Sequence, residues 1–515
     1  MEFTRRDFFK IAAASIGTAA VSGCSSHHPP LKTTDFENQD YKHFPALGLV
    51  TSVREEYKYE ARVEGAIPQE LRGTLYRNGP GLFERAGLRK RCMLDGDGMI
   101  QAFRFGHGRV QYQNKFVQTE KYVKESQTGK FIYATWSTQA PGGVLPNFLS
   151  KAKSQAGVTA IVRDKRLYAF DDFNYPYQLD PNTLDTLGIA DFGLPGQPVR
   201  FFAHTKMDPR TGEWFLFGIE YGPRVDLHMT VFNNSDKPIK HQAYRLPRNT
   251  YVHDFFVTEK HIIFILPAID INFFEVLTGQ KSFLGAISWK PEIGNIVCVF
   301  DRHGDRPPIQ LETEACWSWH TINAYEADDE IIADFIGYQN PDHIIGDDPA
   351  LFAIMSGRKG QYSYPGEIRR YVINTARKTI HFEILDDGNY EFPAINLDHQ
   401  CQRYRFGYFA KKQDRELFFT GITRVDMKTL RSESFDFGQA TYCSEPVFVP
   451  KPGFKYSADT KAESGWLLTE VYDGGKHKTL LAIFEAERIA DGPVAQAYLD
   501  DALPLGFHGY WHSQP

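Results

Sequence analysis

Short apolar runs separated by turn residues recur along the chain from about residue 45 to its end. Each run is four to seven residues long, is rich in aromatic and β-branched side chains, and is bounded by Gly, Asp, Asn or Pro. Clear examples are residues 214–218, 261–266, 330–335 and 466–471. This pattern predicts β-strands, whereas the periodicity of amphipathic helices is scarce. The chain is therefore expected to be all-β.

The runs form one uninterrupted region. No change of composition and no low-complexity linker separates them after residue 45. Many strands in a row favour a single large domain, residues 45–515, of the propeller type. No exact repeat period is visible, so two β-sandwiches in tandem remain the alternative architecture.

The first 44 residues read as a targeting segment followed by a linker. Residues 5–10, RRDFFK, match a twin-arginine export signal, and the apolar stretch 11–21 is too short to cross a bilayer of about 30 Å. Residues 21–24, VSGC, resemble a bacterial lipobox, in which the cysteine, here Cys24, is lipidated. We therefore expect a signal peptide at 1–23, a flexible linker at 24–44, and export by the twin-arginine route to a lipid-anchored position on the periplasmic or outer-membrane side of the cell envelope.

Composition narrows the class of protein. The chain is 42% hydrophobic, 24% charged and 14% aromatic, which is typical of a folded protein and favours apolar cavities. Its net charge of −6 includes no long basic run, so we expect no nucleic-acid partner. Beyond Cys24, the cysteines form no CxxC pair, which predicts core residues and not a zinc finger or a disulfide framework.

Four of the 17 histidines stand apart because each lies in an apolar, aromatic stretch: His204, His253, His320 and His508. A buried histidine must satisfy both ring nitrogens, and a metal on one with a hydrogen-bond acceptor on the other does so. In a propeller, distant strands can aim their imidazoles at the common axis. Imidazole binds Fe, Zn, Cu and Ni alike, so these residues predict a metal site without naming the metal. The sequence lacks HExxH, GxSxG and glycine-rich phosphate motifs, which leaves zinc hydrolysis, serine hydrolysis and nucleotide chemistry without support.

Further motifs surround these histidines: LYRNGP (75–80), LDGDGM (94–99), AH (203–204) with DPRTGE (208–213), HDF (253–255), HTINAYE (320–326), EFPAIN (391–396), SEPVFVP (444–450) and PLGFHG (504–509). Together they resemble the carotenoid cleavage oxygenase family, whose members cleave carotenoids, apocarotenoids and stilbenoids. The resemblance covers nearly all of the mature chain. The LDGDGM stretch itself reads as a turn, because Asp-Gly pairs supply the positive φ that tight turns need, and it is assigned no chemistry.

The resemblance implies a seven-bladed β-propeller with one Fe(II) per chain on its axis, held by the four histidines, and a cap of loops and short helices over the site. It also implies three carboxylates behind the histidines. Glu391 and Glu445 match two of these positions and would each accept a hydrogen bond from a ligand Nδ1. The third position is Asp172, where the family has Glu. Because Asp is one methylene shorter, it is expected to reach its histidine either directly or through a water.

The activity implied is oxidative cleavage of a C=C bond by O₂ into two carbonyl products, with no catalytic residue beyond the metal centre and no NADH, flavin or 2-oxoacid site. The expected substrate is an apocarotenoid or carotenoid held in a long apolar tunnel, and a lipid tether suits such membrane-borne molecules. One alternative is a hydroxystilbene, although stilbenoid cleavers of the family carry a phenol-binding Lys where this chain has Asp171. The other is a non-catalytic propeller that binds a lipophilic ligand.

Overall fold

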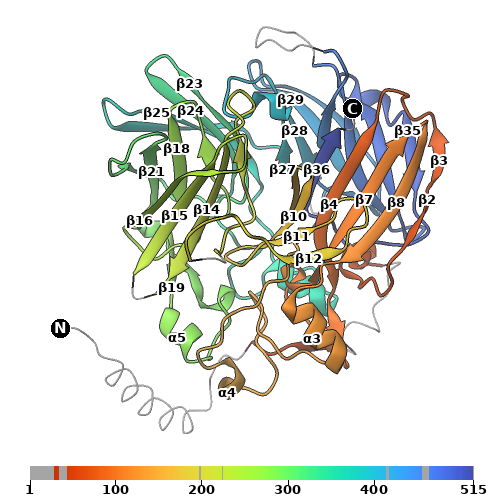
Figure 1. The fold of residues 1–515 in the computed structure, drawn as a ribbon, viewed down its shortest axis with the longest axis horizontal. Coiled ribbons are helices and arrows are strands. Elements are labelled where there is room, and N and C mark those ends of the chain that lie inside the picture. Colours follow the sequence, from red (N-terminus) through yellow and green to blue (C-terminus); the bar gives the residue numbers. More distant parts are fainter. Residues whose placement is uncertain are drawn as a thin grey trace.

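The computed structural model describes residues 28–33, 43–196, 199–222, 224–412, 417–454 and 463–513. Antiparallel strands are the main secondary structure of this part of the chain, and the helices described in it are few and short (Figure 1). The expected signal peptide 1–23 and Cys24 lie outside the described residues. Among the helices that are described, none has the length and hydropathy needed to span a bilayer.

Seven sheets of four or more strands are built from the described residues. The sheet nearest the chain ends has the order β2 (Lys58–Glu60), β8 (Arg109–Phe116), β7 (Asp97–Gly106), β4 (Gly73–Leu82) and β36 (His508–Ser513). The next three contain β9 (Thr159–Arg163), β10 (Arg166–Phe170), β11 (Tyr177–Leu179) and β12 (Thr186–Ile189); then β13 (Lys206–Met207), β14 (Trp214–Tyr221), β15 (Val225–Phe232) and β16 (Pro238–Arg245); then β17 (Phe256–Val257), β18 (His261–Leu266), β21 (Asn295–Asp301) and β22 (Ile309–Thr313).

The other three large sheets come from the second half of the chain, apart from one strand. They contain β23 (Thr321–Ala327), β24 (Glu330–Gly337), β25 (Glu367–Asn374) and β26 (Thr379–Asp386); then β27 (Tyr390–Ala394), β28 (Phe406–Lys411), β29 (Gly421–Asp426) and β30 (Arg431–Asp436); then β3 (Arg62–Gly65), β35 (Ala495–Tyr498), β34 (Lys478–Glu485), β33 (Gly465–Asp473), β31 (Thr441–Cys443) and β32 (Val447–Pro450). Two small sheets add β1 (Leu31–Lys32), β6 (Leu88–Arg89) and β5 (Glu84–Arg85), and β19 (Ile269–Ile271) with β20 (Ile287–Trp289).

The prediction of a mostly-β chain is confirmed, and the four example runs all fall in strands. Residues 261–266 coincide with β18, while the runs at 214–218, 330–335 and 466–471 lie inside β14, β24 and β33. In most of the large sheets, strands that are consecutive in sequence pair antiparallel, as expected of short strands joined by turns.

An early strand and the last described strand meet in one sheet. The last strand, β36, pairs antiparallel with β4, with His508 opposite Asn78 and Ser513 opposite Gly73. Arg77 on β4 is fully buried and donates to Ser444 Oγ at 2.8 Å and to the carbonyl of Glu445 at 3.0 Å. These bonds hold the 444–445 segment against the sheet that carries His508.

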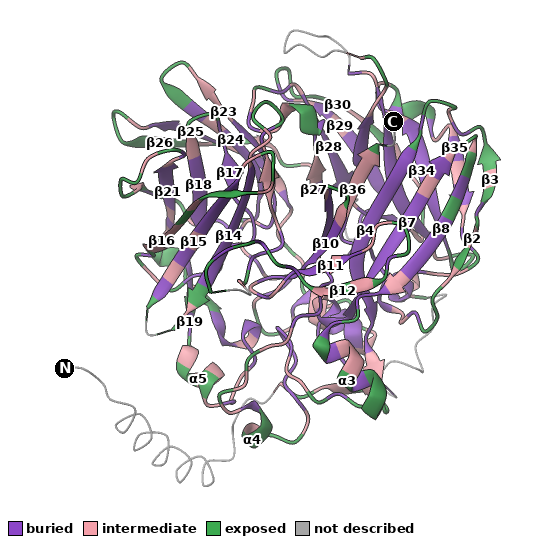
Figure 2. Ribbon diagram, viewed as in Figure 1, coloured by how far each residue is buried: buried purple, intermediate pink, exposed green. Residues whose placement is uncertain are grey.

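Apolar packing between sheets holds the fold together. Every residue of β4 is buried, and the strand interiors of neighbouring sheets are buried in the same way (Figure 2). Rings from adjacent sheets touch directly: the centroids of Phe217 on β14 and Phe264 on β18 are 5.3 Å apart. The five described cysteines are buried and unpaired, as the sequence predicts.

Short helices gather at one end of the sheets. α3 (Glu120–Thr128), α4 (Val144–Asn147) and α5 (Phe273–Leu277) lie together at that end (Figure 1). α3 begins where the Thr119 side chain accepts from the Tyr122 N–H and ends at Gly129, whose φ of 67° is left-handed. Within the described ranges, the other helices are α6 (Ala350–Ala353) and seven 3₁₀ segments, η1 (Pro45–Val50), η2 (Met93–Asp95), η3 (Leu284–Ala286), η4 (Pro291–Ile293), η5 (Ile354–Ser356), η6 (Leu397–His399) and η7 (Ile489–Asp491).

Part of the segment expected to be a flexible linker, 24–44, is docked on the body. Within it the structure describes residues 28–33, where β1 pairs with β6 and the His28 Nδ1 lies 3.0 Å from Ser282 Oγ. Backbone pairing and a side-chain hydrogen bond hold this stretch, which apolar periodicity alone does not reveal.

Candidate metal centre

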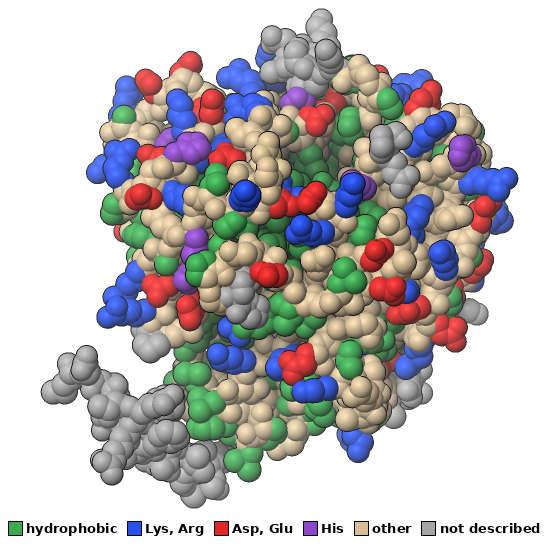
Figure 3. Space-filling view, in the orientation of Figure 1, with side chains coloured by type: hydrophobic (Ala, Val, Ile, Leu, Met, Phe, Trp, Pro, Cys, Tyr) green, Lys and Arg blue, Asp and Glu red, His purple; other side chains and the backbone are tan. Residues whose placement is uncertain are grey.

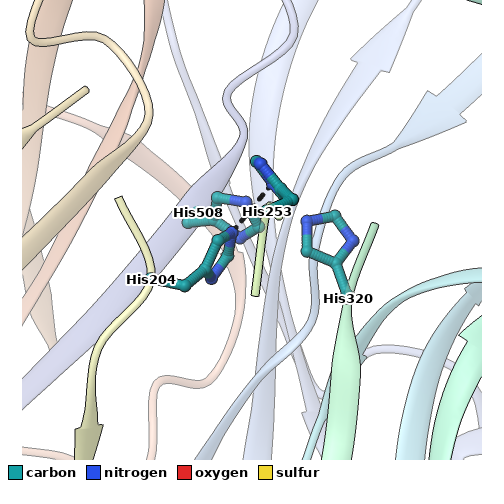
Figure 4. Close-up of side chains that lie close together, drawn as sticks. All are labelled: His204, His253, His320 and His508. Atoms are coloured by element: carbon teal, nitrogen blue, oxygen red, sulfur yellow. Dashed lines mark hydrogen bonds between the residues drawn. The ribbon is translucent and has the colours of Figure 1, made fainter. Parts of the chain in front are cut away.

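Four imidazoles from distant parts of the chain converge on one point (Figure 4). One ring nitrogen from each of His204, His253, His320 and His508 lies within 4.8 Å of the others. His204, His253 and His320 stand just before β13, β17 and β23, and His508 is the first residue of β36. Each histidine therefore lies in, or just before, an edge strand of a different sheet.

The three predicted carboxylates stand behind these histidines, on the sheets that carry no imidazole. Asp172 follows β10, Glu391 lies on β27, and Glu445 lies between β31 and β32. The four histidines and three carboxylates thus come from seven different sheets, one residue from each.

Each carboxylate contacts the Nδ1 of one histidine. Glu445 Oε1 lies 2.9 Å from His508 Nδ1, and its other oxygen accepts the Gly509 N–H at 2.6 Å. Glu391 accepts from His320 Nδ1 in the same way. Because a carboxylate can only accept, Nδ1 carries the proton and Nε2 presents its lone pair to the centre.

Asp172 makes its contact directly, without an intervening water. Its Oδ2 lies 2.9 Å from His253 Nδ1. Tyr251, which the sequence reasoning did not select, completes the contact: its hydroxyl hydrogen-bonds Asp172 and lies 2.8 Å from His253 Nδ1. Tyr251 stands two residues before His253, so in extended chain both side chains lie on one face, and that spacing is the signal that could have found it.

His204 is the ligand without a carboxylate. It is only half-buried and lines a second cavity, with Lys206 and Asp254, on a different side of the cluster from the main apolar one. The Nε2 atom of His204 lies 3.0 Å from the Nε2 atom of His253. The latter nitrogen carries a lone pair, because the proton of His253 is on Nδ1, facing Asp172. Two nitrogens bound side by side at a right angle on one metal, each at about 2.1 Å, would be separated by about 3.0 Å.

Charge and hydrogen bonding at the centre also fit a metal cation. Burial lowers the pKa of His204 well below its ordinary value, and burial lowers the pKa of His508 despite the neighbouring Glu445. Burial opposes the charged form of His320 too, but the Glu391 carboxylate outweighs it and raises that pKa. His320 Nε2 is buried, and the described residues offer it no hydrogen-bond partner. A buried lone pair left unmatched in this way is satisfied when a metal binds, and imidazoles are suitable ligands for Fe(II).

A largely apolar cavity of about 140 Å³ opens on the cluster. It reaches His253, His320 and His508, and its walls are mostly aromatic and aliphatic, with Trp319, Phe392 and Phe507 beside the histidines. Such a cavity admits a lipophilic molecule to the metal side of the imidazoles and keeps bulk water away.

Comparison with known proteins gives one consistent result. A sequence model of the family described as retinal pigment epithelial membrane protein (RPE65) matches residues 50–513. The chain is similar to apocarotenoid-15,15'-oxygenase from Synechocystis, with 29% identity over 87% of this chain and 92% of that protein. It is also similar to isoeugenol monooxygenase from Pseudomonas nitroreducens, with 26% identity over 89% of this chain and 95% of that one. A solved glutamate-to-aspartate variant of Synechocystis apocarotenoid oxygenase superposes with a TM-score of 0.84 at 27% identity, covering 92% of this chain and 99% of that one.

Proposed function

The chain belongs to the RPE65 family of carotenoid cleavage oxygenases, and we propose that it uses O₂ to cleave a C=C bond of an apocarotenoid or carotenoid into two carbonyl products. The four-histidine Fe(II) site of that family is present in the chain. The observation that carries the proposal is the opening of this site into an apolar cavity.

The chemistry balances without a further cofactor. An alkene R–CH=CH–R′ and one O₂ give R–CHO and R′–CHO, so no reductant and no leaving group is required. Bound Fe(II) supplies the redox chemistry that lets O₂ react with the alkene. The chain's own residues orient the imidazoles through Asp172, Glu391 and Glu445, and they position one double bond by apolar contact.

The cavity wall favours a polyene over a phenolate. At Asp171, the position of the phenol-binding Lys in stilbenoid cleavers, a buried carboxylate accepts the backbone N–H groups of Gln155 and Asp172 at 2.8 and 3.0 Å. Burial raises the pKa of Asp171 to about 7. This side chain offers no positive charge to a phenolate oxygen.

A second candidate substrate is a phenolic alkene of the hydroxystilbene type. The similarity to isoeugenol monooxygenase supports it, since isoeugenol is itself a phenolic alkene. The two candidates share the metal centre and differ only in what the cavity holds.

Incubation of the iron-loaded protein with an apocarotenal and with a hydroxystilbene distinguishes them. We expect two aldehyde products from the apocarotenal, with a kcat/KM at least about tenfold above that for the stilbene, because apolar contacts alone discriminate by roughly ten to two hundredfold. If aldehydes form from the stilbene only, the hydroxystilbene becomes the preferred substrate and the apocarotenoid proposal is wrong. The His320→Ala protein is the control for metal-independent oxidation of either compound.

The same proposal extends to the architecture. Seven sheets, each contributing one residue to the centre, are what seven blades around a common axis would provide, and they support one propeller domain over residues 45–515. The pairing of β36 with β4 would close the ring.

We further propose export by the twin-arginine route and a lipid anchor at Cys24, which places the protein at a membrane face. Exposed apolar side chains on α4 and α5 support contact with that membrane (Figure 3). Leu145 is 80% exposed and Phe274 is 50% exposed. The two segments are neighbours, since the Leu149 N–H donates to the Leu277 carbonyl at 2.8 Å, and Ala152 just beyond them lines the cavity. A lipophilic substrate could then pass from bilayer to cavity.

Binding to neutral phosphatidylcholine vesicles tests this surface in a Cys24→Ser chain, where no lipid anchor can contribute. The double variant Leu145→Glu/Phe274→Glu should bind vesicles at least about tenfold more weakly, because burying each such side chain contributes about 1.5–3 kcal/mol and a buried carboxylate opposes it. Ile384→Glu, an exposed apolar residue on β26, is the matched control and should bind as the parent does. If Ile384→Glu weakens vesicle binding as much as the double variant does, the α4 and α5 surface is not a specific membrane-binding face.

A further inference from the structure

One wall of the metal-site cavity carries a histidine that the metal does not use. His343 lies between β24 and α6, is 3% exposed, and lines the cavity that reaches His253 and His320. The Trp319 Nε1–H donates to His343 Nε2 at 2.8 Å. The rings of Tyr338 and Tyr362 pack on His343 with centroids 4.7 and 5.4 Å away, which fixes the imidazole in place.

The hydrogen bond from Trp319 determines where the proton on His343 lies. An indole N–H can only donate, so Nε2 must be the bare nitrogen. Burial, with a contribution from the charge of Lys412, lowers the pKa of His343 to about 3, so the ring is neutral. The single ring proton is therefore on Nδ1.

This Nδ1–H has no partner. Among the described residues, no acceptor lies within hydrogen-bonding distance of the buried Nδ1. Buried N–H groups are almost always hydrogen-bonded, because leaving one unpaired costs the lost interaction with water. An unpaired donor on a side chain that lines the metal-site cavity is the arrangement expected of a group that awaits a ligand atom.

His343 also stands at a defined place relative to the metal centre. The Trp319 ring lies between them, with its centroid 5.0 Å from that of His253 and 6.2 Å from that of His343. The His343 ring is therefore separated from the metal ligand His253 by the Trp319 ring, and it lies on the wall of the cavity that a long substrate would occupy.

We propose that His343 is a specificity-determining residue, whose Nδ1–H donates a hydrogen bond to an oxygen on the substrate and so anchors it relative to the metal. This inference rests on the proposed function and narrows it: the preferred substrate is an oxygen-bearing apocarotenoid, such as an aldehyde, and not a pure hydrocarbon. A neutral imidazole suits a neutral acceptor, a carbonyl or a hydroxyl, and gives no charge to a carboxylate. Because the oxygen is held at a fixed place, the double bond that lies beside the metal is determined by its distance from that oxygen.

Equilibrium binding to the iron-loaded protein without O₂ tests the inference separately from turnover. The probes are an apocarotenal and the same polyene with a methyl group in place of the aldehyde. The native protein should bind the aldehyde at least about tenfold more tightly, a difference of about 1.4 kcal/mol. In His343→Phe the ratio of the two dissociation constants should fall to about one. His343→Gln should keep most of the ratio, because its amide oxygen can accept from Trp319 while its NH₂ donates to the ligand.

The matched control is Trp136→Phe. Trp136 lines the same cavity and also carries a buried N–H that no described residue pairs with, so its loss should leave the ratio unchanged if His343 is the anchor. General damage to the cavity would weaken both probes together and leave the ratio unchanged. A native protein that binds both probes equally, or a ratio that survives in His343→Phe, would overturn this inference and leave the cleavage activity standing. Failure to bind either probe would overturn the proposed function with it.

Discussion

Replacing His320 with alanine should reduce cleavage of the C=C substrate by more than about a thousandfold, to the level of the metal-free protein. His320 supplies one of the four ring nitrogens at the centre, and its buried Nε2 has no hydrogen-bond partner among the described residues. Its removal also leaves the buried Glu391 carboxylate facing a void. The measurement is product formation from an apocarotenal at saturating iron and O₂.

The control for this variant is His381→Ala on β26. The His381 side chain is 73% exposed and lies outside the cluster, so its loss should leave activity unchanged. Circular dichroism and the thermal midpoint should show that His320→Ala is folded. A folded His320→Ala protein that retains activity within tenfold of the native protein would show that this histidine is not needed for the reaction.

Two substitutions of Glu391, the carboxylate behind His320, should weaken iron binding to different extents. Glu391→Gln keeps an acceptor for Nδ1–H but loses the charge, and roughly a tenfold weaker affinity is expected. Glu391→Ala leaves Nδ1–H and the Phe392 N–H without that acceptor, and the loss should approach a hundredfold. Competition with a chelator of known affinity measures both.

Glu463→Gln is the matched change for this series. Glu463 is also a buried carboxyl group, but it hydrogen-bonds Tyr408 at 3.2 Å and takes no part in the histidine cluster. Burial raises the pKa of Glu463 to about 7, so near neutral pH the amide replaces a group that is only about half ionised. Equal loss of iron affinity in Glu391→Gln and Glu463→Gln would mean that the effect is one of general stability and not of ligand orientation.

The four histidines were predictable because each stands in a run of apolar residues next to a recognisable motif. His253 and His320 lie beside Phe255 and Trp319, and such surroundings are unusual for an imidazole that has no partner. What the residues alone did not give was the metal, since imidazole accepts several. The resemblance and the family match supplied Fe(II).

The roles of the three carboxylates could not be predicted from their local sequence alone. Glu391 and Glu445 resemble ordinary strand-end glutamates until the sheets bring them behind His320 and His508. For Asp172 the sequence left direct contact and a water bridge open. In the structure, Asp172 contacts His253 Nδ1 directly and also binds the Tyr251 hydroxyl. The spacing of Tyr251 and His253 hints at the second contact, but the distance from Asp172 to the imidazole is set by backbone placement, which the sequence does not show.

Strand positions followed from apolar runs and turns, yet the grouping of strands into seven sheets did not. No repeat period marks the sheets, and β3 and β36 join sheets that are distant in sequence. His343 was missed for a related reason: its stretch, residues 341–347, reads as a turn and contains no aromatic residue. Its contact with Trp319 and its place on the cavity wall arise only in the folded chain.

The most direct test of the whole account is the iron content of the protein after loading with Fe(II) and removal of unbound metal. We expect one iron per chain in the native protein and almost none in His320→Ala, with both proteins folded. A native protein that binds no Fe(II), and whose metal content is the same in His320→Ala, would contradict it.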